Sequence, residues 1–258
     1  MAIDTTFDFT SDSPGYWDGF WERRQGLGSG GCDPDSASPT LRRYHCELWS
    51  RELPCGRRME LRDAGTHMEW DGRRFSSDSI AASFRYFRNR ELLEEVASSV
   101  DDYRGFVESF LHSTYTIGGM MIFPRRNGGM NQTRGSMRCI SDRWDLTLEC
   151  IRRHYAGEEN PLEECMRRDQ WFYDYFVDFR GFVEFFLLQD CVTKNYDVRI
   201  WGNWNGFDDD PIPKDVNEYL NWIDGQLKYV RKRNKRISYL GKKNHSKANS
   251  AEVSINIS

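Results

Sequence analysis

The amino-acid sequence predicts a mainly helical α+β fold, a single domain with one small antiparallel β-hairpin or short sheet. Apolar residues recur every three or four positions, as on one face of a helix, over residues 40–51, 91–98, 102–113 and 142–155. Apolar and polar residues alternate in residues 57–75 on either side of Asp71-Gly72, a pair typical of a tight hairpin turn. Hydrophobic residues make up 38% of the 258, which is enough to bury a core and excludes a wholly disordered chain.

Composition divides the chain into three parts. Residues 1–39 are rich in Gly, Ser, Asp and Pro and are expected to form a flexible N-terminal arm. Residues 40–236 are expected to be the globular domain, and residues 237–258, which are basic and polar, a disordered tail. No apolar run approaches the roughly 18 to 20 residues of a membrane span, and the first residues do not read as a signal peptide. We therefore expect a soluble cytoplasmic protein without a membrane partner.

The first half of the domain is expected to begin with a helix capped by Thr40, because a side-chain hydroxyl can accept from the free N–H groups of a first turn. After the hairpin, Ser77 or Asp78 is expected to cap another helix, which residues 80–87 would begin. Residues 116–123 are short and apolar and are expected to be extended.

In the second half, the apolar residues of 142–155 step by four, three and four and so share one helix face. Pro161 and Pro213 each open a further helix, since proline is tolerated in a first turn. Residues 170–190 are strongly aromatic and are expected to be buried, and residues 196–201 alternate like an edge strand.

One segment is almost repeated. Residues 104–111, Arg-Gly-Phe-Val-Glu-Ser-Phe-Leu, match residues 180–187 at seven of eight positions, and each copy is preceded by Asp and an aromatic residue. The match does not extend further, which favours two helices that pack alike over a true internal repeat.

The most unusual segment is the Gly-, amide- and Arg-rich stretch 117–135. Backbone N–H groups and guanidinium groups in such a loop can bind a phosphate or a carboxylate, so Asn131, Gln132 and Arg134 are candidate ligand-binding residues. The glycine spacing is that of neither a dinucleotide-binding loop nor a P-loop. The alternative is a surface loop whose Asn and Arg side chains hold its own turns.

A row of carboxylates follows on the helix after this loop. Asp142, Asp145 and Glu149 share one face, where two like charges four residues apart disfavour the helix unless a cation compensates. With a divalent metal, such carboxylates would suit a hydrolase or nuclease, and we take all three as candidate catalytic residues. The alternative is a solvated face with Glu149 paired to Arg152 or Arg153.

Three further residues complete the candidate site. Arg42 and Arg143 would add guanidinium groups to a ligand site, and His45, near acidic residues, would suit a general base. The alternative for His45 is a hydrogen-bonding residue beside a packed helix. The histidines and the seven cysteines show no metal-binding spacing, so no metal ligands are assigned. Residues 228–243 hold eight basic residues and no acid, which suits nucleic-acid phosphates or a solvated tail.

Several of these segments resemble a bacterial family of domains of unknown function over roughly residues 30–200. The resemblance lies in Asp33-Pro34-Asp35, in Ser38-Pro-Thr-Leu-Arg-Arg-Tyr-His45, in Ser77-Asp-Ser-Ile80, in Asn131-Gln-x-Arg-Gly135 and in Asp142-Arg-x-Asp-Leu-Thr-Leu-Glu-Cys-Ile-Arg-Arg153. It implies no activity, but it implies that these polar segments act together. A weaker resemblance, of Ile117-Gly-Gly119 to a segment of HNH-type nucleases, lacks the nuclease's metal-and-base element.

The sequence therefore predicts a binding domain for a phosphate-bearing ligand, either a nucleotide or a nucleic acid. One alternative is a metal-dependent hydrolase or nuclease, and another is a protein-interaction factor of a phage or mobile-element conflict system. Whether the protein is an enzyme, and which cofactor it uses, is left open by the sequence.

Overall fold

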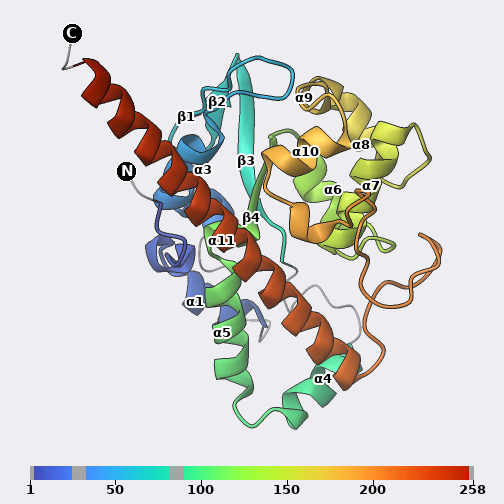
Figure 1. Cartoon of the computed structure of the whole chain (residues 1–258). Coiled ribbons are helices and arrows are strands. Elements are labelled where there is room, and N and C mark those ends of the chain that lie inside the picture. Colours follow the sequence, from blue (N-terminus) through green and yellow to red (C-terminus); the bar gives the residue numbers. More distant parts are fainter. Residues whose placement is uncertain (1–2, 25–32, 82–89, 256–258) are drawn as a thin grey trace.

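The computed structural model describes residues 3–24, 33–81 and 90–255, with side chains described for 3–21, 33–81 and 90–241. It confirms a mainly helical α+β fold with one small antiparallel sheet, in the strand order β1-β2-β3-β4. Figure 1 shows helices α6 to α10 gathered on one side of the sheet, with α1 and α3 on the other and the long helix α11 crossing the molecule diagonally. None of the helices described is both long and apolar enough to cross a membrane.

The element bounds are as follows. The helices are α1 (Tyr16–Arg24), α2 (Pro34–Ala37), α3 (Pro39–Trp49), α4 (Arg90–Ser99), α5 (Tyr103–Thr114), α6 (Met130–Ser136), α7 (Trp144–Ala156), α8 (Glu163–Arg168), α9 (Gln170–Asp174), α10 (Phe179–Phe185) and α11 (Val216–Ile255). The strands are β1 (Arg62–Asp63), β2 (Met68–Trp70), β3 (Arg73–Ser79) and β4 (Met120–Pro124). Short 3-10 helices are η1 (Phe9–Asp12), η3 (Ile117–Gly119) and η4 (Gln189–Cys191).

The predicted hairpin is confirmed and is part of a larger sheet. Asp71 and Gly72, with φ of 53° and 67°, form the two-residue turn between β2 and β3. Beyond the hairpin, β3 pairs along its length with β4, from Phe75 opposite Pro124 to Ser79 opposite Met120. Because β3 continues through Ser79, Ser77 and Asp78 lie in a strand, and the prediction that one of them caps a helix is wrong. The residues 82–87 expected to follow in that helix lie outside the described residues.

Helix starts and loops account for the other differences. Ser38, not Thr40, caps α3, since its hydroxyl accepts from Leu41 N at 3.0 Å and Pro39 occupies the first turn. Asn131, Gln132 and Arg134 lie on helix α6 and not in an irregular loop. Residues 196–201, expected as an edge strand, form only an isolated bridge between Val192 and Val198.

The two ends of the chain also differ from expectation. Phe9, Tyr16 and Phe20 are buried in the core, so the described part of the expected N-terminal arm is built into the fold. The backbone of residues 237–255 continues α11 where we expected a disordered tail.

The two nearly identical segments, residues 104–111 and 180–187, each lie at the start of a helix, and the two helices are capped in the same way. Asp102 and Asp178 accept from the backbone N–H of Gly105 and Gly181, at 2.9 Å and 2.7 Å. A Cβ atom on Gly105 would lie 2.1 Å from the Asp102 carboxylate, which explains the glycine. In each copy, moreover, the Arg forms an ion pair with the Glu four residues later. Shared local chemistry therefore accounts for the resemblance.

Helix α11 is joined to the rest of the fold by a buried arginine. Arg233 is 0% exposed, and its guanidinium donates to the carbonyls of Gly118 at 3.0 Å, Met120 at 2.7 Å and Phe186 at 3.0 Å. These carbonyls belong to η3, β4 and the end of α10. One side chain thus satisfies three buried acceptors from two separate parts of the chain.

We expect Arg233→Leu to lower the free energy of unfolding by at least about 3 kcal/mol, because each buried carbonyl left without a donor costs about 1–3 kcal/mol. Urea denaturation of both proteins measures the difference. Arg231→Leu, on the exposed side of the same helix, is the matched control and should change stability by no more than about 0.5 kcal/mol. Equal losses in the two variants would contradict the role assigned to Arg233.

Candidate functional site

A pocket of about 450 Å³ lies where α2, the end of β3, α6 and the turn before α7 meet. We call it the aspartate pocket, because four aspartates line it together with small, polar and aromatic residues. Its lining consists of Asp33, Asp35, Asp78, Ser79, Ala81, Tyr115, Asn131, Gln132, Gly135, Ser136 and Asp142. Four of the segments that carried the family resemblance, 33–35, 77–80, 131–135 and 142–153, thus come together around one space.

Arg134 lies beneath the pocket and holds two of its carboxylates. The residue is 1% exposed, with Nε 2.7 Å from Asp78 Oδ2 and Nη1 2.9 Å from Asp142 Oδ1. Its remaining donors contact the carbonyl oxygens of Asp142 and Ser79. A guanidinium has five N–H donors in a fixed fork, and here each of its three nitrogens contacts at least one protein acceptor. Arg134 therefore positions the acidic wall, and it does not line the pocket.

Burial makes two carboxyls of the pocket, those of Asp35 and Asp78, harder to ionise. Burial raises the pKa of Asp35 well above its ordinary value, and the charges of Asp33 and Asp78 raise it further. Burial also raises the pKa of Asp78 to about 7, although the neighbouring guanidinium of Arg134 opposes the change. Burial alone would lower the pKa of Arg134, but the carboxylates of Asp142 and Asp78 outweigh it and raise that pKa. The arginine stays charged, while protons bind to the cluster near neutral pH.

Two acceptors at the pocket are buried without a donor among the described residues. Asp35 accepts from Ser79 N at 3.0 Å through Oδ2, which leaves Oδ1 unmatched. Asn131 donates from Nδ2 to Ser76 Oγ and to the Ser77 carbonyl, and its Oδ1 is unmatched. Buried polar atoms are nearly always hydrogen-bonded, so two such acceptors beside one pocket call for a partner that donates.

The backbone at the rim of the pocket is strained. Ser141 and Asp142 have φ of 47° and 60°, a left-handed conformation that side chains other than glycine rarely adopt. Such residues cost about 1–3 kcal/mol each and persist where surrounding contacts enforce them, often at functional sites. Here the ion pair with Arg134 holds Asp142, and a hydrogen bond from Ser141 Oγ to the Arg138 carbonyl, 2.7 Å long, holds the turn.

The structure places Arg143 and Asp145 in a different location. The two side chains form a bidentate ion pair, with Arg143 Nε 3.1 Å from Asp145 Oδ1 and Nη2 2.5 Å from Oδ2. Arg143 also donates to the carbonyls of Pro211 and Trp201, and Asp145 accepts from Trp201 N. The pair therefore anchors the segment between α10 and α11 to the start of α7.

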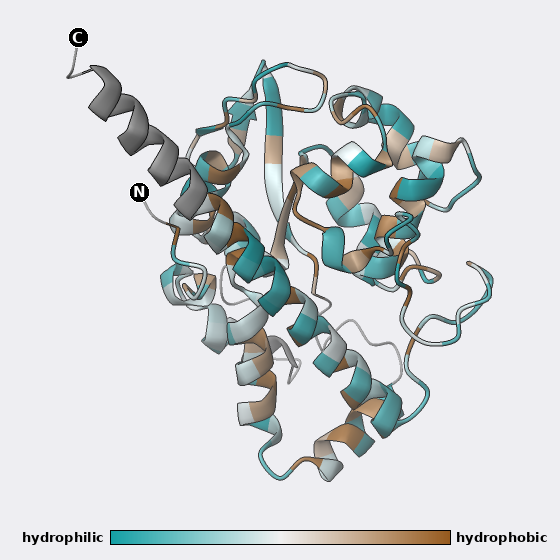
Figure 2. Cartoon of the chain, viewed as in Figure 1, coloured by the Kyte–Doolittle hydropathy of each residue, from teal (hydrophilic) through white to brown (hydrophobic). Residues whose placement is uncertain are grey.

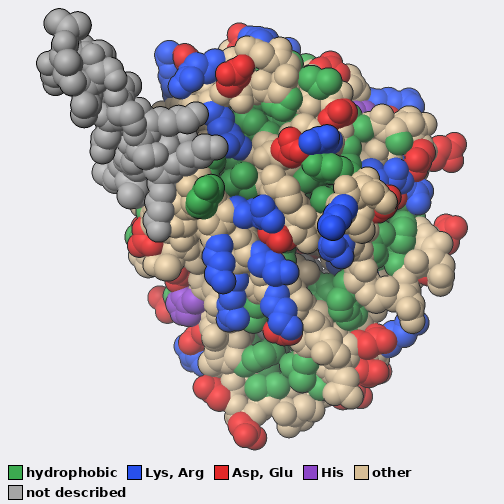
Figure 3. Space-filling model, viewed as in Figure 1, with side chains coloured by type: hydrophobic (Ala, Val, Ile, Leu, Met, Phe, Trp, Pro, Cys, Tyr) green, Lys and Arg blue, Asp and Glu red, His purple; other side chains and the backbone are tan. Residues whose placement is uncertain are grey.

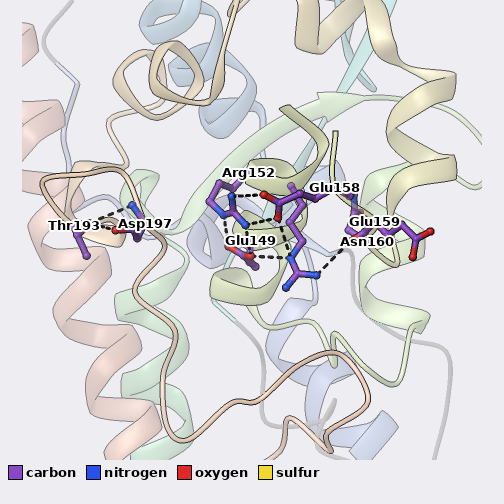
Figure 4. A network of polar contacts seen from close by, with 8 residues as sticks. Glu149, Arg152, Glu158, Glu159, Asn160, Thr193 and Asp197 are labelled. Atoms are coloured by element: carbon purple, nitrogen blue, oxygen red, sulfur yellow. Dashed lines mark hydrogen bonds and ion pairs between the residues drawn. The ribbon is translucent and has the colours of Figure 1, made fainter. Parts of the chain in front are cut away.

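Glu149 belongs to a third group. Its side chain is 7% exposed, and its carboxylate oxygens accept from Arg152 Nε at 2.8 Å and from Arg153 Nε at 2.9 Å. Glu158 also pairs with Arg152, which completes the network shown in Figure 4. Glu149 therefore pairs with Arg152 and Arg153 as the alternative expected, but it is buried and does not lie on a solvated face. Asp145 and Glu149 thus face different partners, and no group of three or more potential metal-binding side chains occurs in the part of the chain that the structure describes.

His45 and Arg42 also lie apart from the aspartate pocket. His45 is fully buried, accepts from Trp49 Nε1 at Nδ1 and contacts Ser77 Oγ through Nε2, both at 2.9 Å. Burial, helped by the charge of Arg233, lowers the pKa of His45 to about 3, so the ring is neutral and both of its nitrogens are occupied. Arg42 binds Asp63 at 3.0 Å and the Ser36 carbonyl at 3.0 Å. Both residues hold the fold together.

Of the nine candidate residues, the structure brings Asn131, Gln132, Arg134 and Asp142 to one pocket. Sequence reasoning missed Asp33, Asp35 and Asp78, whose local signal was that of turn and cap residues. Asp33 does cap α2, through its contact with Asp35 N at 3.2 Å. The family resemblance was the signal that linked these segments.

The raised pKa of Asp78 predicts a specific pH dependence of stability. A carboxyl with a higher pKa in the folded state holds more protons when folded, so its contribution to stability is full below about pH 4 and is lost as pH rises through about 7. Asp78→Asn removes this titration while keeping an oxygen for Arg134. We expect the fall in unfolding free energy between about pH 5 and 8 to be smaller in the variant, by up to about 1.4 kcal/mol per pH unit at the steepest point.

Urea denaturation at a series of pH values measures this slope. The control is Asp101→Asn, at an exposed aspartate before α5, which should keep the wild-type slope. The same slope in wild type and Asp78→Asn would show that Asp78 does not titrate in this window.

Comparison with known proteins places the chain in a family. A model of a family of unknown function matches residues 3–237, which confirms the resemblance inferred from the motifs. No curated protein and no solved structure matches the chain.

Proposed function

The chain belongs to this family of unknown function (DUF6994), and from its pocket we propose that it binds a small organic cation, an amine or a guanidinium compound. The observation that carries the proposal is Asp35, a buried carboxyl at the pocket whose Oδ1 has no donor among the described residues. An ammonium or guanidinium group would supply both the missing donor and the positive charge.

The charge balance supports a cation over an anion. Among the described residues, four carboxyls and one guanidinium belong to the pocket and its base. A phosphate would meet these carboxyls, while the donors of Arg134 and of Asn131 Nδ2 are already bonded to protein acceptors. The phosphate-bearing ligand predicted from residues 131–134 therefore stays a prediction, and the pocket does not favour it.

The shape and lining of the pocket suit a small molecule. A volume of about 450 Å³ lies within the range of small-molecule sites. Tyr115 contributes an aromatic ring, to whose face a cation is attracted. Asn131 contributes a second unmatched acceptor, Oδ1. Amines with several nitrogen atoms would engage both acceptors at once.

A second candidate function, acid–base catalysis on the bound molecule, is favoured by Asp78. A carboxyl whose pKa lies at about 7 exchanges its proton at neutral pH, which is the property a general acid or base requires. Asp78 would be the group involved. The predictions of a metal-dependent nuclease, a conflict-system interaction factor and a cytoplasmic location receive no support from the pocket.

We expect putrescine, spermidine or agmatine to raise the melting temperature of the protein in a saturable way, whereas ATP does not. The raised pKa values of Asp35 and Asp78 mean that protons compete with the cation, so affinity should be several-fold weaker at about pH 5.5 than at about pH 8. Calorimetric titration at both pH values measures this difference.

Asp35→Asn should weaken cation binding by about tenfold or more, since it removes the charge while keeping the shape. Asp101→Asn, which removes an exposed charge elsewhere, should leave the affinity unchanged. Stabilisation by ATP but by none of the cations would overturn the proposal and favour the phosphate-bearing ligand.

A further inference from the structure

The outward side of α11 carries a basic stripe. Figure 3 shows Lys and Arg side chains gathered over this helix, and Figure 2 shows that the visible side of α11 is mostly hydrophilic. Lys228, Arg231, Lys232, Lys235 and Tyr239 are exposed, and we call them the α11 stripe. At 3.6 residues per turn they fall within an arc of about 100° and extend over about 16 Å of helix.

Most of this positive charge is not compensated. Lys228 forms an ion pair with Asp224, 2.5 Å away, at the N-terminal end of the stripe. Arg231, Lys232 and Lys235 make no ion pair with the described residues. The neighbouring Arg236 is paired with Asp190 and is not counted in the stripe. Lys232 lies near enough to Asp190 to lower the pKa of that carboxyl, but it makes no direct ion pair with it. Three neighbouring cations without an ion pair, on a protein with a net charge of −4, are a local property of this helix.

The opposite side of α11 excludes insertion into a lipid surface. A helix that lies in a membrane interface buries an apolar face in the lipid. The apolar residues of α11, among them Trp222, Ile223, Val230 and Ile237, are buried in the core of the protein. No apolar face is therefore left for lipid in the described part of α11, and a polyanion is the better partner for the stripe.

A groove beside the stripe adds an aromatic ring. Its volume is about 530 Å³, and its lining consists of Thr5, Thr6, Arg231, Asn234, Lys235, Ser238 and Tyr239. Tyr239 is 73% exposed, which is unusual for a large aromatic side chain. Asn234 is held in place by Gly118 N and Thr116 Oγ1, so it forms a fixed wall. Cations that alternate with an exposed aromatic ring are the pattern that binds single-stranded nucleic acid.

We propose that the α11 stripe and its groove bind single-stranded nucleic acid, with phosphates on Arg231, Lys232 and Lys235 and a base stacked on Tyr239. The cations supply a contact that does not depend on sequence, and every base has a face that can stack on the ring. A duplex keeps its bases stacked inside and leaves Tyr239 without a partner, so single strands are preferred. This proposal does not rest on the aspartate pocket, which none of the stripe residues lines.

Fluorescence anisotropy with the full chain and labelled oligo(U) or oligo(dT) of about 20 nucleotides tests the proposal. We expect the triple variant Arg231→Gln/Lys232→Gln/Lys235→Gln to bind about tenfold more weakly or worse. Its slope of log K against log salt should fall by about 2, since each lost phosphate contact removes about 0.7. Tyr239→Ala should bind about 5- to 100-fold more weakly with an unchanged salt slope, because stacking is not electrostatic.

The matched control is Arg62→Gln/Arg138→Gln/Lys214→Gln, which removes three exposed charges from other parts of the surface. It should retain the wild-type affinity and slope. Equal weakening in the two triple variants would overturn the proposal, because it would reduce the binding to overall charge. Three other results would also overturn the proposal: the wild-type protein does not bind the oligonucleotides, it binds duplex and single strand equally, or it binds only to vesicles that contain phosphatidylserine. RNA and DNA probes distinguish the two kinds of strand.

Discussion

The buried guanidinium of Arg233 is the interaction on which the arrangement of this fold depends. It is charged, fully buried and has no carboxylate partner among the described residues; backbone carbonyls and the sulfur of Met121 surround it. Burial lowers its pKa, but from an ordinary value so high that the group stays protonated. A buried charge is tolerated only when its hydrogen bonds are made, so α11, η3 and the end of α10 must keep their relative positions.

This constraint extends to the pocket through the sheet. Helix α11 approaches η3 so closely that a Cβ atom on Gly118 would lie 2.6 Å from the Val230 carbonyl. The chain leaves η3 as β4, and β4 pairs with β3 to set Asp78 opposite Met121. Arg134 then reaches Asp78 from α6, and Asp142 from the turn before α7. The two buried arginines therefore have different roles. Arg233 binds backbone carbonyls and holds α11 against η3 and the end of α10, whereas Arg134 binds two carboxylates and positions the wall of the aspartate pocket.

What could be predicted from the sequence depended on how local each signal was. Helices such as α5 and α7 and the Asp71-Gly72 turn follow from residues within one or two turns of each other, and they were predicted correctly. The pairing of β3 with β4 joins residues 41 to 49 positions apart, and Ser77 and Asp78 carry a cap signal that this pairing overrides. In the same way, Arg134 was identified as a ligand-binding cation because its partner Asp78 lies 56 positions away, and because Asp142, eight positions on, is brought back to it by a turn with positive φ.

A nearly balanced net charge conceals two regions of opposite sign. The aspartate pocket gathers four carboxyls from three segments around one arginine, whereas the α11 stripe presents three cations that form no ion pair with the described residues. Each region repels the ligand that suits the other, so a polyanion on the stripe is kept out of the pocket. Residues 115–118 contact both the aspartate pocket and the α11 stripe. Tyr115 lines the pocket, and Thr116 and Gly118 form hydrogen bonds with Asn234 beside the stripe. Because Asn234 is also a wall of the groove, the backbone that shapes the pocket also determines the surface next to Tyr239.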